Sequence, residues 1–468
     1  MVLKKLPACG LNLKNTSDLF KRAGRRSQSI VDLSYKTPRE FIPFIGEGAG
    51  GSSLLYGMAM ERGHVDDFKC WPITYKEIEP YYQEAEILFG VAPSKSLCAQ
   101  NQIISDFLVS NGLTPYKLPL ASQQKLECQG CQGQLCSHNN KNHAGNCALQ
   151  AALNFEGNLL LDECEVVSLI ENSNKITNVI IKRNNQTFRI NGNNVVLAAG
   201  ALETPRILFK SSTIEHSNGL ANSSGKVGKN LMRHLIDLYL LEASEPVAKG
   251  IIKELAFNDF YRLPEGKGGT VQSFGYMPPV ELVLQDIFRD LSFQSKFVSR
   301  GLQILSPFLK FFLNKLISNS VVFASIVEDS PCEDNQVLAI RDQTSFIYKV
   351  KEADQIRLKS MRKKLQGVFK SKLKMKIFSG GKNTLLAHAC GTCRMGIDSK
   401  DSVVDKNGKC HDISNLFIAD ASVFPTSLGV NPALTIAANA IRMAHEMTKG
   451  KPAKTPKTQC KVNELQIH

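Results

Sequence analysis

The chain has 468 residues, of which 43% are hydrophobic and 21% are charged. This length and composition describe an ordinary globular protein with core material for about three domains, and they exclude a disordered or collagen-like chain. The formal net charge is +14, from 57 basic and 43 acidic residues, and part of the excess lies in a basic tail over residues 449–468. Such a tail is usually solvated, so we expect no nucleic-acid partner; contact with a nucleic acid or a membrane surface is the minor alternative.

No hydrophobic segment of the sequence predicts a membrane span or a secretory signal. The most apolar region is interrupted by Arg300, Lys310 and Lys315, so it falls short of the roughly 18 uninterrupted apolar residues of a spanning helix. The start of the chain is basic but lacks the apolar core of a signal peptide. Thirteen cysteines, an odd number, favour mostly reduced thiols over a disulfide scaffold, and we expect a cytoplasmic protein.

A glycine-rich loop follows the first forty residues, which are polar and basic and contain no strand rich in valine or isoleucine. Residues 46–51 satisfy the G-x-G-x-x-G fingerprint of a dinucleotide-binding turn. Asp66 and Asp67 follow it at a spacing that would suit the acidic residue of such a unit. That fingerprint needs a strand before it and a helix after it, so that the phosphates meet the helix N-terminus. Because Pro43 interrupts the first strand and no β-branched strand leads to Asp66, we reject this interpretation. A plain tight turn is the alternative.

Secondary-structure patterns are clearest in two later regions. Thr74 and Glu77 form a capping box, and apolar residues at helical spacing predict a helix that Gly90 ends. Between residues 158 and 200, short apolar runs separated by Asn-Asn and Asn-Gly pairs predict strands joined by hairpin turns. The last run, residues 195–198, predicts a buried strand that leads into a helix beginning near Thr204.

The middle of the chain, residues 236–384, has little pattern and no diagnostic motif from which a substrate could be read. Within it, residues 297–327 are apolar and basic at once. An amphipathic surface helix that covers a cleft is the favoured interpretation, and docking to a membrane is the alternative.

Four cysteines follow the pattern C-x2-C-x4-C-x10-C, with His138 and His143 inside it. Two cysteines three positions apart fit one edge of a tetrahedral zinc site, and an iron–sulfur cluster is a second alternative. The second half lacks the C-x-x-C pair of a zinc ribbon, so a disulfide or free thiols are favoured and no metal is expected. The candidate metal ligands are Cys128, Cys131, Cys136 and Cys147.

The segment GEGAGGSSLLYGMAMERGHVDDF, with the WPITYKEIEPYYQEAEILFGV that follows, resembles the flavin-attachment region of the glucose-methanol-choline (GMC) oxidoreductases. The family has a GGSS-x-x-x-G-M-like loop there. The resemblance implies that FAD is the cofactor and that this loop presents small residues and backbone amides to the flavin, an approach that residues without Cβ permit. The matching residues are Gly50, Gly51, Ser52 and Ser53.

The strongest resemblance lies in HACGTCRMG and in NLFIADASVFPTSLGVNPALTIAANAIRMA. In the GMC family a histidine opens the first motif, and a histidine or asparagine stands just before the last helix; these positions are His388 and Asn431 here. The resemblance implies that His388 is the general base and that Asn431 donates a hydrogen bond to the same substrate oxygen. Imidazole, with an ordinary pKa near 6.5, suits proton removal from an alcohol, and an amide donor stabilises a developing alkoxide.

Further cofactor contacts follow from the same resemblance. Asn431 and Pro432 predict the start of the last helix, with its dipole aimed at the flavin. Asp420 resembles the family's carboxylate near the ribityl chain, with an ordinary turn residue as the alternative, and VVLAAGALETPRILFKSS resembles the nucleotide-domain strand and helix. For Val167, core packing is an equal alternative to an adenine contact. Besides the loop residues, the implied cofactor-binding residues are Val167, Gly200, Ala201, Asp420, Ala421 and Pro432.

GMC proteins begin with a βαβ unit that carries a genuine G-x-G-x-x-G and seats the ADP part of FAD. No such unit is recognisable before Phe41, so the resemblance covers residues 41–447 and we expect an FAD-binding domain that is incomplete at its N-terminus. Three explanations stay open: a truncated gene product, a first unit supplied by another polypeptide, and a lineage that no longer binds flavin.

The sequence as a whole therefore predicts a mixed α/β (α+β) fold, with a nucleotide domain interleaved with a substrate-binding domain. The expected function is FAD-dependent oxidation of the CH–OH group of a small-molecule alcohol; sterol-like, sugar and simple alcohols stay open. The alternatives are a non-catalytic or partner-dependent remnant, and a metal-binding redox protein centred on the cysteine loop. An electron-acceptor or complementing protein partner is open. The predicted segments are a divergent stretch 1–40, a GMC N-terminal-type region 41–235, a substrate-binding region 236–384, a GMC C-terminal-type region 385–448 and the tail 449–468.

Overall fold

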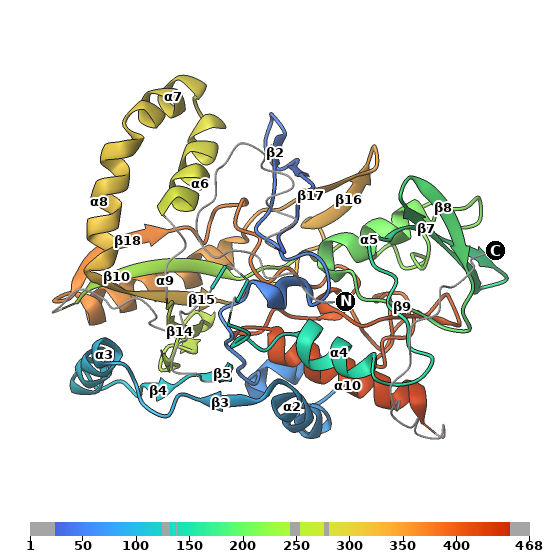
Figure 1. Ribbon diagram of the computed structural model, residues 1–468, viewed down its shortest axis with the longest axis horizontal. Coiled ribbons are helices and arrows are strands. Elements are labelled where there is room, and N and C mark those ends of the chain that lie inside the picture. Colours follow the sequence, from blue (N-terminus) through green and yellow to red (C-terminus); the bar gives the residue numbers. More distant parts are fainter. Residues whose placement is uncertain are drawn as a thin grey trace.

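The computed structural model describes residues 24–123, 132–133, 135–136, 138–243, 253–275 and 280–449, and its architecture is mixed α/β, as predicted (Figure 1). A six-stranded antiparallel sheet dominates one half of the described chain. Smaller sheets make up the other half, together with the helices α2 (Tyr75–Phe89), α4 (Gln150–Ala152), α5 (Gly200–Lys210) and α10 (Ala433–Thr448). In spatial order, the large sheet consists of β18 (Leu373–Phe378), β10 (Leu235–Glu242), β15 (Ser320–Val327), β14 (Gly269–Ser273), β11 (Leu255–Phe257) and β4 (Tyr116–Lys117).

Side-chain alternation along the central strand β15 divides the core between the two faces of this sheet. Val321 and Phe323 face the helix α9 (Glu352–Phe369), whose Leu365 packs in the same cluster. Val322 points the other way, into a cluster with the end of the helix α8 (Ser306–Ser318). Every residue of β15 is buried, which explains why its sequence is apolar apart from Ser320 and Ser325.

The face away from α9 changes its neighbour along the sheet. At the β11 end, Ala256 packs with Met58 and Ala59, which follow the glycine-rich loop. Gln272 of β14 pairs with Ala256 across the strands, so its side chain lies on this same face. The sheet thus presents a polar residue toward the segment that carries the predicted flavin loop.

Two helices brace the other half of the molecule. The helix α2 (Tyr75–Phe89) begins at the predicted Thr74–Glu77 capping box and ends at Gly90, which has a positive φ of 57°. It packs against α10 (Ala433–Thr448), and a hydrogen bond of 2.7 Å joins the hydroxyls of Tyr82 and Thr435. The predicted last helix therefore exists, with Pro432 rather than Asn431 as its capping residue.

The strands predicted between residues 158 and 200 exist, but the expectation that the last of them is buried is wrong, since Val196 is 46% exposed. The others form the antiparallel sheet β6 (Glu165–Asn172), β7 (Lys175–Arg183) and β8 (Gln186–Ile190). Asn184 and Asn185 turn between β7 and β8 with positive φ of 48° and 61°, as a hairpin turn requires. The strand β9 (Val195–Leu197) pairs in parallel with β19 (Leu416–Ile418) and leads into α5 (Gly200–Lys210), four residues earlier than Thr204.

The expectation that the first forty residues contain no strand is wrong. The strand β1 (Ile30–Asp32) pairs with β2 (Arg39–Phe41) and, in parallel, with β17 (Gln343–Ile347), which continues to β16 (Gln336–Ile340). Strands of three residues are too short to show a two-residue hydrophobic period, and one partner of β1, the strand β17, comes from a distant part of the chain.

The glycine-rich loop does not form a Rossmann-type dinucleotide-binding turn, in agreement with the sequence analysis. The loop leads into a short 3-10 helix, η1 (Gly51–Leu54), and Asp66 and Asp67 lie on another, η2 (Val65–Cys70). Asp67 is buried and ion-paired to Lys267 at 2.8 Å. The carboxylate of Asp67 therefore stabilises the protein interior and does not bind a ribose.

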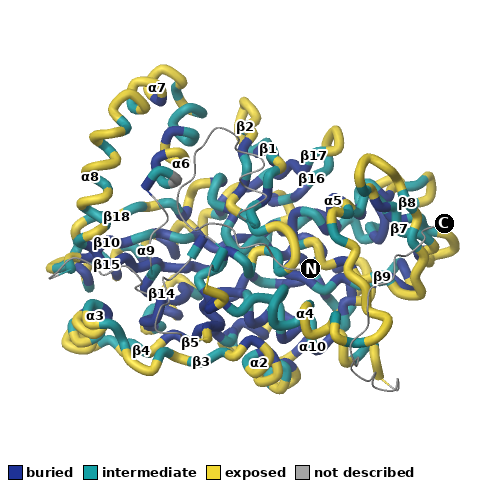
Figure 2. Tube along the Cα trace, in the orientation of Figure 1, coloured by how far each residue is buried: buried dark blue, intermediate teal, exposed yellow. Residues whose placement is uncertain are grey.

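Residues 297–327 do not form the single helix that their composition predicted. They comprise most of α7 (Lys296–Ile304), α8 and the buried strand β15, and with α6 (Val280–Ser292) the two helices project from the body (Figures 1 and 2). None of the helices in the described ranges combines the length and the apolar character that crossing a membrane requires. The remaining elements are β3 (Val91–Pro93), α3 (Ala99–Ser110), β5 (Pro119–Ala121), η3 (Gly145–Leu149), α4 (Gln150–Ala152), β12 (Arg262–Leu263), β13 (Gly266–Lys267) and η4 (Ala421–Val423).

Candidate active site

Two histidines from distant parts of the chain meet at the start of β10. The Nδ1 atoms of His234 and His388 are 2.7 Å apart, and the two rings are nearly perpendicular at 81°. The Nε2 atom of His234 lies 2.9 Å from the carbonyl oxygen of Leu428. One imidazole, His234, thus connects the predicted base to the loop that leads to Asn431.

The hydrogen bonds determine where the ring protons sit. A carbonyl oxygen only accepts, so His234 must donate from Nε2 to Leu428. Burial lowers the pKa of His234 to about 4, so at neutral pH this is its single ring proton and its Nδ1 carries a lone pair. The short contact then requires His388 to donate from its own Nδ1. Neutral His388 therefore keeps a lone pair on Nε2, the form that can accept a proton.

Backbone pairing holds the two histidines side by side. Met232 and Cys390 exchange both backbone hydrogen bonds, of 3.0 and 2.9 Å, and the amide of His234 donates to Ala387. His388 itself has a φ of 62°, in the left-handed region, which costs about 1–3 kcal/mol for a residue of this kind. The structure retains this strained conformation at the residue whose side chain faces His234.

Asn431 is buried and held by the large sheet. Gln272 of β14 donates from Nε2 to Asn431 Oδ1 at 2.7 Å. This bond engages the oxygen of the Asn431 carboxamide and leaves its NH2 group as the end that can donate elsewhere. Gln272 is fully buried, and its Oε1 has no hydrogen-bond partner among the described residues.

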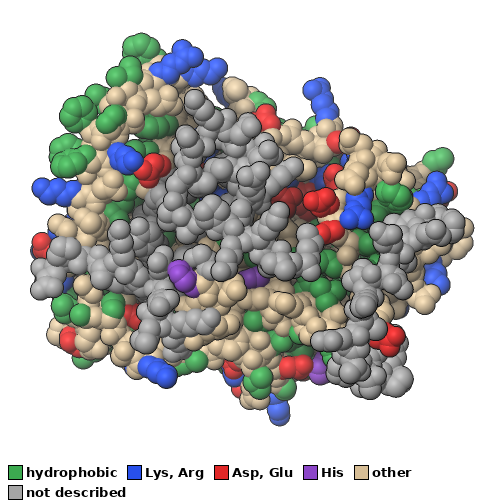
Figure 3. Space-filling view, in the orientation of Figure 1, with side chains coloured by type: hydrophobic (Ala, Val, Ile, Leu, Met, Phe, Trp, Pro, Cys, Tyr) green, Lys and Arg blue, Asp and Glu red, His purple; other side chains and the backbone are tan. Residues whose placement is uncertain are grey.

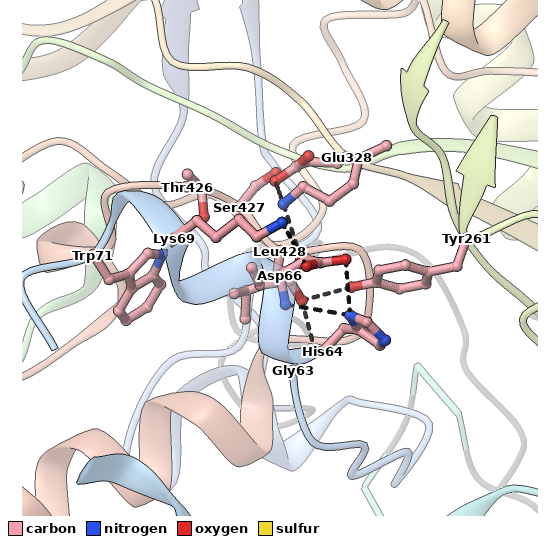
Figure 4. Close-up of polar contacts among 12 residues, drawn as sticks. Gly63, His64, Asp66, Lys69, Trp71, Tyr261, Glu328, Thr426, Ser427 and Leu428 are labelled. Carbon is pink, nitrogen blue, oxygen red and sulfur yellow. Dashed lines mark hydrogen bonds and ion pairs between the residues drawn. The ribbon is translucent and has the colours of Figure 1, made fainter. Parts of the chain in front are cut away.

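The loop before Asn431 is fastened on two sides. The amide of Thr270 donates to Gly429 at 2.9 Å. The ring of Tyr261 packs against Gly429, and its hydroxyl donates to Asp67 at 2.5 Å. Lys267 bridges Asp67 and Glu328, which completes the polar network seen around Tyr261 and Glu328 in Figure 4. A cavity of about 300 Å³ adjoins this network and is lined by Arg62, Gly63, His64, Val65, Tyr75, Asn258, Tyr261 and Val430.

The electrostatics of the site keep His388 uncharged. Burial, His234 and Lys253 together hold the pKa of His388 well below 6.5. Lys253 is itself buried, which lowers its pKa to about 8 in spite of attraction to Glu61. Because a neutral imidazole is the proton-accepting form, these groups favour the state that a general base requires at neutral pH.

The glycine-rich loop braces itself with its own serines. Ser53 Oγ donates to the Gly50 carbonyl at 2.5 Å and accepts from the Ala144 amide at 3.1 Å. Ser52 Oγ accepts from the Gly46 amide. The Ser53 hydroxyl is thus used within the protein, whereas the backbone of the loop and the O–H of Ser52, which only accepts among the described residues, can offer contacts to a ligand.

Open space lies beside two glycines that sequence analysis assigned to the cofactor. Gly51 has a φ of +52° and Gly200 a φ of +82°, and a Cβ built at either residue meets no atom within 4 Å. Arg26 connects the two regions, since its amide donates to Ile45 and its guanidinium pairs with Glu203 of α5 at 2.7 Å. A side chain at either glycine would fill this space, so the residues present fit a group that lies against the bare backbone.

Asp420 lies at the end of β19 and is committed to protein donors. Its Oδ2 accepts from the Gly200 amide at 2.8 Å and from Thr204 Oγ1 at 2.6 Å, and its Oδ1 accepts from the Ser422 amide at 2.8 Å. The carboxylate thus caps the N-terminus of α5. Ala421 is buried beside it, and its carbonyl accepts from Gly391 of the HACGTC motif. Ala201, also buried, accepts a bond from Thr392 of that motif.

Val167 occupies a β-bulge. Val166 pairs with Ile181 and Ser168 pairs with Ile180, so Val167 is left without a partner on β7. A bulge exposes backbone groups of the extra residue, which is the feature that an adenine contact through the main chain would use. The adenine contact and core packing both stay predictions for Val167.

Half of the cysteine motif lies outside the described residues, namely Cys128 and Cys131. Cys136 accepts a hydrogen bond from the Asn140 amide, and Cys147 is half-buried. In the ranges that the structure does describe, His, Cys, Asp and Glu side chains form no group of three or more that could hold a metal ion. The metal hypothesis for this loop stays a prediction, as does the solvated basic tail, of which only residue 449 is described.

Known protein families match the two parts of the chain that build this site. The models that match are those of the N-terminal and C-terminal domains of the GMC oxidoreductases, over residues 17–236 and 339–440. The chain belongs to the GMC oxidoreductase family. Membership of this family confirms the predicted reaction class. The protein is an oxidoreductase that uses FAD to oxidise the CH–OH group of a small-molecule alcohol.

The match also corrects one expectation. The N-terminal model of the GMC family begins at residue 17, so the prediction that the family's N-terminal unit is lacking before Phe41 is not borne out. In the described part of that stretch, the chain contributes the short strands β1 and β2 rather than a longer strand with a visible pattern.

Full-length relatives of this GMC protein are distant in sequence. The 2-methyl-1,2-propanediol dehydrogenase of Mycolicibacterium austroafricanum is 23% identical over 458 residues, which cover 86% of this chain and 80% of the relative. The fructose dehydrogenase large subunit of Gluconobacter japonicus is 24% identical, over 85% of this chain and 80% of the relative. A long-chain-alcohol oxidase of Arabidopsis thaliana, FAO4A, is 52% identical over 50 residues, 11% of this chain and 7% of the relative.

Solved structures share the fold. Pyridoxine 4-oxidase from Mesorbium loti matches with a TM-score of 0.64 and 18% identity, over 94% of this chain and 92% of that protein. Formate oxidase from Aspergillus oryzae matches with a TM-score of 0.62 and 14% identity, over 91% and 88%. At these identities the likeness concerns the fold, and it agrees with the predicted α/β class.

Sequence reasoning on the GMC motifs missed three polar residues of the site. His234 lies in VGKNLMRHL, outside the motifs from which the site was predicted. Gln272 and Lys253 lie in the unpatterned middle of the chain, and no local signal marks either of them. All three act on His388 or Asn431 across separations of more than a hundred residues.

Proposed function

We propose that His388 is the general base of this oxidoreductase and removes the hydroxyl proton of the alcohol at its Nε2 atom. The observation that carries this role is the chain of hydrogen bonds from Leu428 through His234 to His388, which leaves the lone pair on that atom. The depressed pKa of His388 supports the same role, because the ring is uncharged before the alcohol arrives.

Asn431 stabilises the oxygen from which the proton leaves. Gln272 engages the Asn431 Oδ1 atom, so the NH2 group is the donor available to an alkoxide. The loop of residues 428–431 carries both the carbonyl that orients His234 and the amide of Asn431. Base and donor are tied to one loop through His234, with no direct hydrogen bond between them in the described chain.

The backbone around Gly51 and Gly200 holds the cofactor, together with the loop at Gly50, Ser52 and Ser53 and the N-terminus of α10. FAD, when bound, supplies the acceptor for the hydride of the carbinol carbon. Open space beside both glycines supports this assignment. The dipole of α10 places partial positive charge near Pro432, which favours an electron-rich ring at that position.

The test of this function is substrate-driven bleaching of the flavin. Purified protein loaded with FAD is mixed without oxygen with a panel of a 1,2-diol, a sugar and a long-chain alcohol, the classes named for the relatives. Loss of the visible flavin absorbance with at least one alcohol is expected. A protein that binds FAD but is reduced by none of these alcohols while dithionite reduces it fully would contradict the proposal.

The chain of hydrogen bonds from Leu428 through His234 to His388 predicts unequal effects of two variants at His234. His234→Leu removes the acceptor for the His388 Nδ1 proton and is expected to lower kcat by about 10- to 100-fold. His234→Asn keeps an acceptor oxygen near the position of Nδ1 and is expected to lose much less. Stopped-flow rates of flavin reduction compare them. Equal losses in the two variants, with equal thermal stability, would show that the acceptor is not what matters.

Lys253 predicts a shift in the pH profile. Replacing it by methionine removes a positive charge that lowers the pKa of His388, so that pKa rises. Because activity is lost as His388 becomes protonated, the acid limb of log kcat/KM against pH moves to higher pH. The matched control is Lys364→Met on the exposed side of α9, for which no shift is expected. A downward shift in Lys253→Met contradicts the assignment.

We further propose a cytoplasmic location and an electron acceptor that reoxidises the flavin, either a small molecule or a protein. Support for the location comes from the odd number of thirteen cysteines, which suits reduced thiols. The described cysteines agree, since no disulfide joins any of them.

A further inference from the structure

The helices α6, α7 and α8 form an arm that projects from the body of the molecule (Figures 1 and 2). Its inner side is a small core of its own, in which Val280, Leu284 and Phe288 of α6 pack with apolar residues of α7 and α8. The end of α8 rests on the large sheet through Leu316 and Ile317. The arm therefore has a packed core of its own, and the residues on its outer side do not contribute to that core.

The outer side of the arm is nevertheless strongly apolar. Six residues, between 50% and 87% exposed, form what we call the outer ridge: Phe297, Ile304, Leu305, Phe308, Phe311 and Phe312. Helices that are apolar on both sides are normally covered. Leaving four phenylalanines and two aliphatic side chains in water on one projecting unit forfeits burial that is worth about 25 cal/mol per Å². Exposed apolar side chains gathered on one projecting unit mark a surface that meets a partner.

The charge around the ridge indicates the partner. From Leu291 to Val327 the sequence has four basic residues, Lys296, Arg300, Lys310 and Lys315, and no aspartate or glutamate. Lys310 pairs with Glu281, whereas the other three make no ion pair with any described residue. Figure 3 shows hydrophobic and basic side chains together along this edge of the molecule. The acidic residues of the arm, Glu281, Asp286 and Asp290, all lie on α6 and pair with Lys310 or Arg289. A surface that complements α7 and α8 is therefore apolar within and anionic at its rim.

A second copy of the chain does not meet this requirement. A symmetric contact between two arms would bring Lys296 and Arg300 against the same positive residues of the partner, and like charges at a contact oppose association. A lipid bilayer with anionic headgroups provides both features, because aromatic side chains insert at the boundary of headgroups and acyl chains while lysine and arginine reach the phosphates.

We propose that the arm docks this protein onto the surface of an anionic lipid membrane, with the outer ridge inserted and Lys296, Arg300 and Lys315 contacting lipid phosphates. The described helices are not suited to cross the bilayer, so the attachment is peripheral. The proposal rests on the arm alone and does not depend on the roles given to His388 and Asn431.

The experiment measures cosedimentation of the full chain, loaded with FAD, with vesicles of phosphatidylcholine alone or of phosphatidylcholine mixed with phosphatidylserine. Binding to the mixed vesicles and little binding to pure phosphatidylcholine are expected, with weakening as salt is raised. Binding to neither kind of vesicle would overturn the proposal.

Two variants of the arm separate insertion from charge. The triple variant Phe308→Ser, Phe311→Ser, Phe312→Ser is expected to bind mixed vesicles more than about 100-fold more weakly. The double variant Lys296→Gln, Arg300→Gln is expected to lose about 30-fold, at about 1 kcal/mol for each basic residue. The matched control is Ile214→Ser with Ile397→Ser, which changes side chains that are 95% and 89% exposed elsewhere on the molecule and leaves binding unchanged.

Folding and self-association are checked in parallel. Flavin absorbance and thermal stability of the arm variants should match those of the parent protein, because the ridge does not contribute to the core. Undiminished vesicle binding by the triple variant would overturn the proposal. So would light scattering that shows a dimer of the parent protein and a monomer of the triple variant, since the ridge would then be a contact between copies.

Discussion

Replacement of His388 by asparagine is expected to lower kcat/KM for an alcohol by about 100- to 10,000-fold, the usual contribution of a general base. Asparagine suits the backbone at this position, because His388 has a φ of 62° and asparagine tolerates the left-handed region better than most residues. The variant therefore isolates the loss of the imidazole from a change in the loop. His388→Ala should show a similar loss of activity together with a lower thermal stability.

The measurement is the rate of flavin reduction by the alcohol in the absence of oxygen, with the flavin content determined first. Both variants should retain FAD, since His388 is not among the residues assigned to hold it. Reduction by dithionite should be normal and serves as the control for a competent flavin. Unchanged reduction by alcohol in His388→Asn would remove this residue from the mechanism.

The second large effect is expected at Asn431. Asn431→Leu keeps the approximate volume of the side chain but removes the NH2 group, and kcat should fall by about 100- to 1,000-fold, as for the loss of one oxyanion donor. The fall should appear mainly in kcat, because the hydrogen bond strengthens as negative charge develops on the substrate oxygen. Steady-state kinetics with saturating alcohol measure it.

Gln272 provides the comparison for Asn431. Its bond to Asn431 Oδ1 orients the carboxamide but does not reach the reacting oxygen, so Gln272→Leu should cost about 10-fold, less than Asn431→Leu. The double variant should be no worse than Asn431→Leu alone, because the orienting bond has no further effect once the donor is gone. A larger loss in Gln272→Leu than in Asn431→Leu would show that Asn431 is not the donor.

Much of the candidate site was predictable from motifs, and the reason is chemical. A proton acceptor for an alcohol and a donor for its oxygen must be particular side chains, so His388 and Asn431 stand out in HACGTCRMG and GVNPALT. The helix that begins at Thr74 and the hairpin at Asn184 were equally readable, because caps and turns depend on residues a few positions apart. Short strands were not: β1 spans three residues and exists through its pairing with β17, more than three hundred positions away.

The amino-acid sequence by itself determined the family of this protein and its reaction class, and it predicted His388 as the base and Asn431 as the donor, since each depends on which side chains are present in a local order. Only the tertiary structure decided on which nitrogen His388 carries its proton, because that follows from a 2.7 Å contact with His234 and from a carbonyl at Leu428 that cannot donate. It alone also decided that Gln272 orients the amide of Asn431 and that the six residues of the outer ridge face outward. Direction and distance between residues far apart in the chain are properties of packing, and no local pattern encodes them.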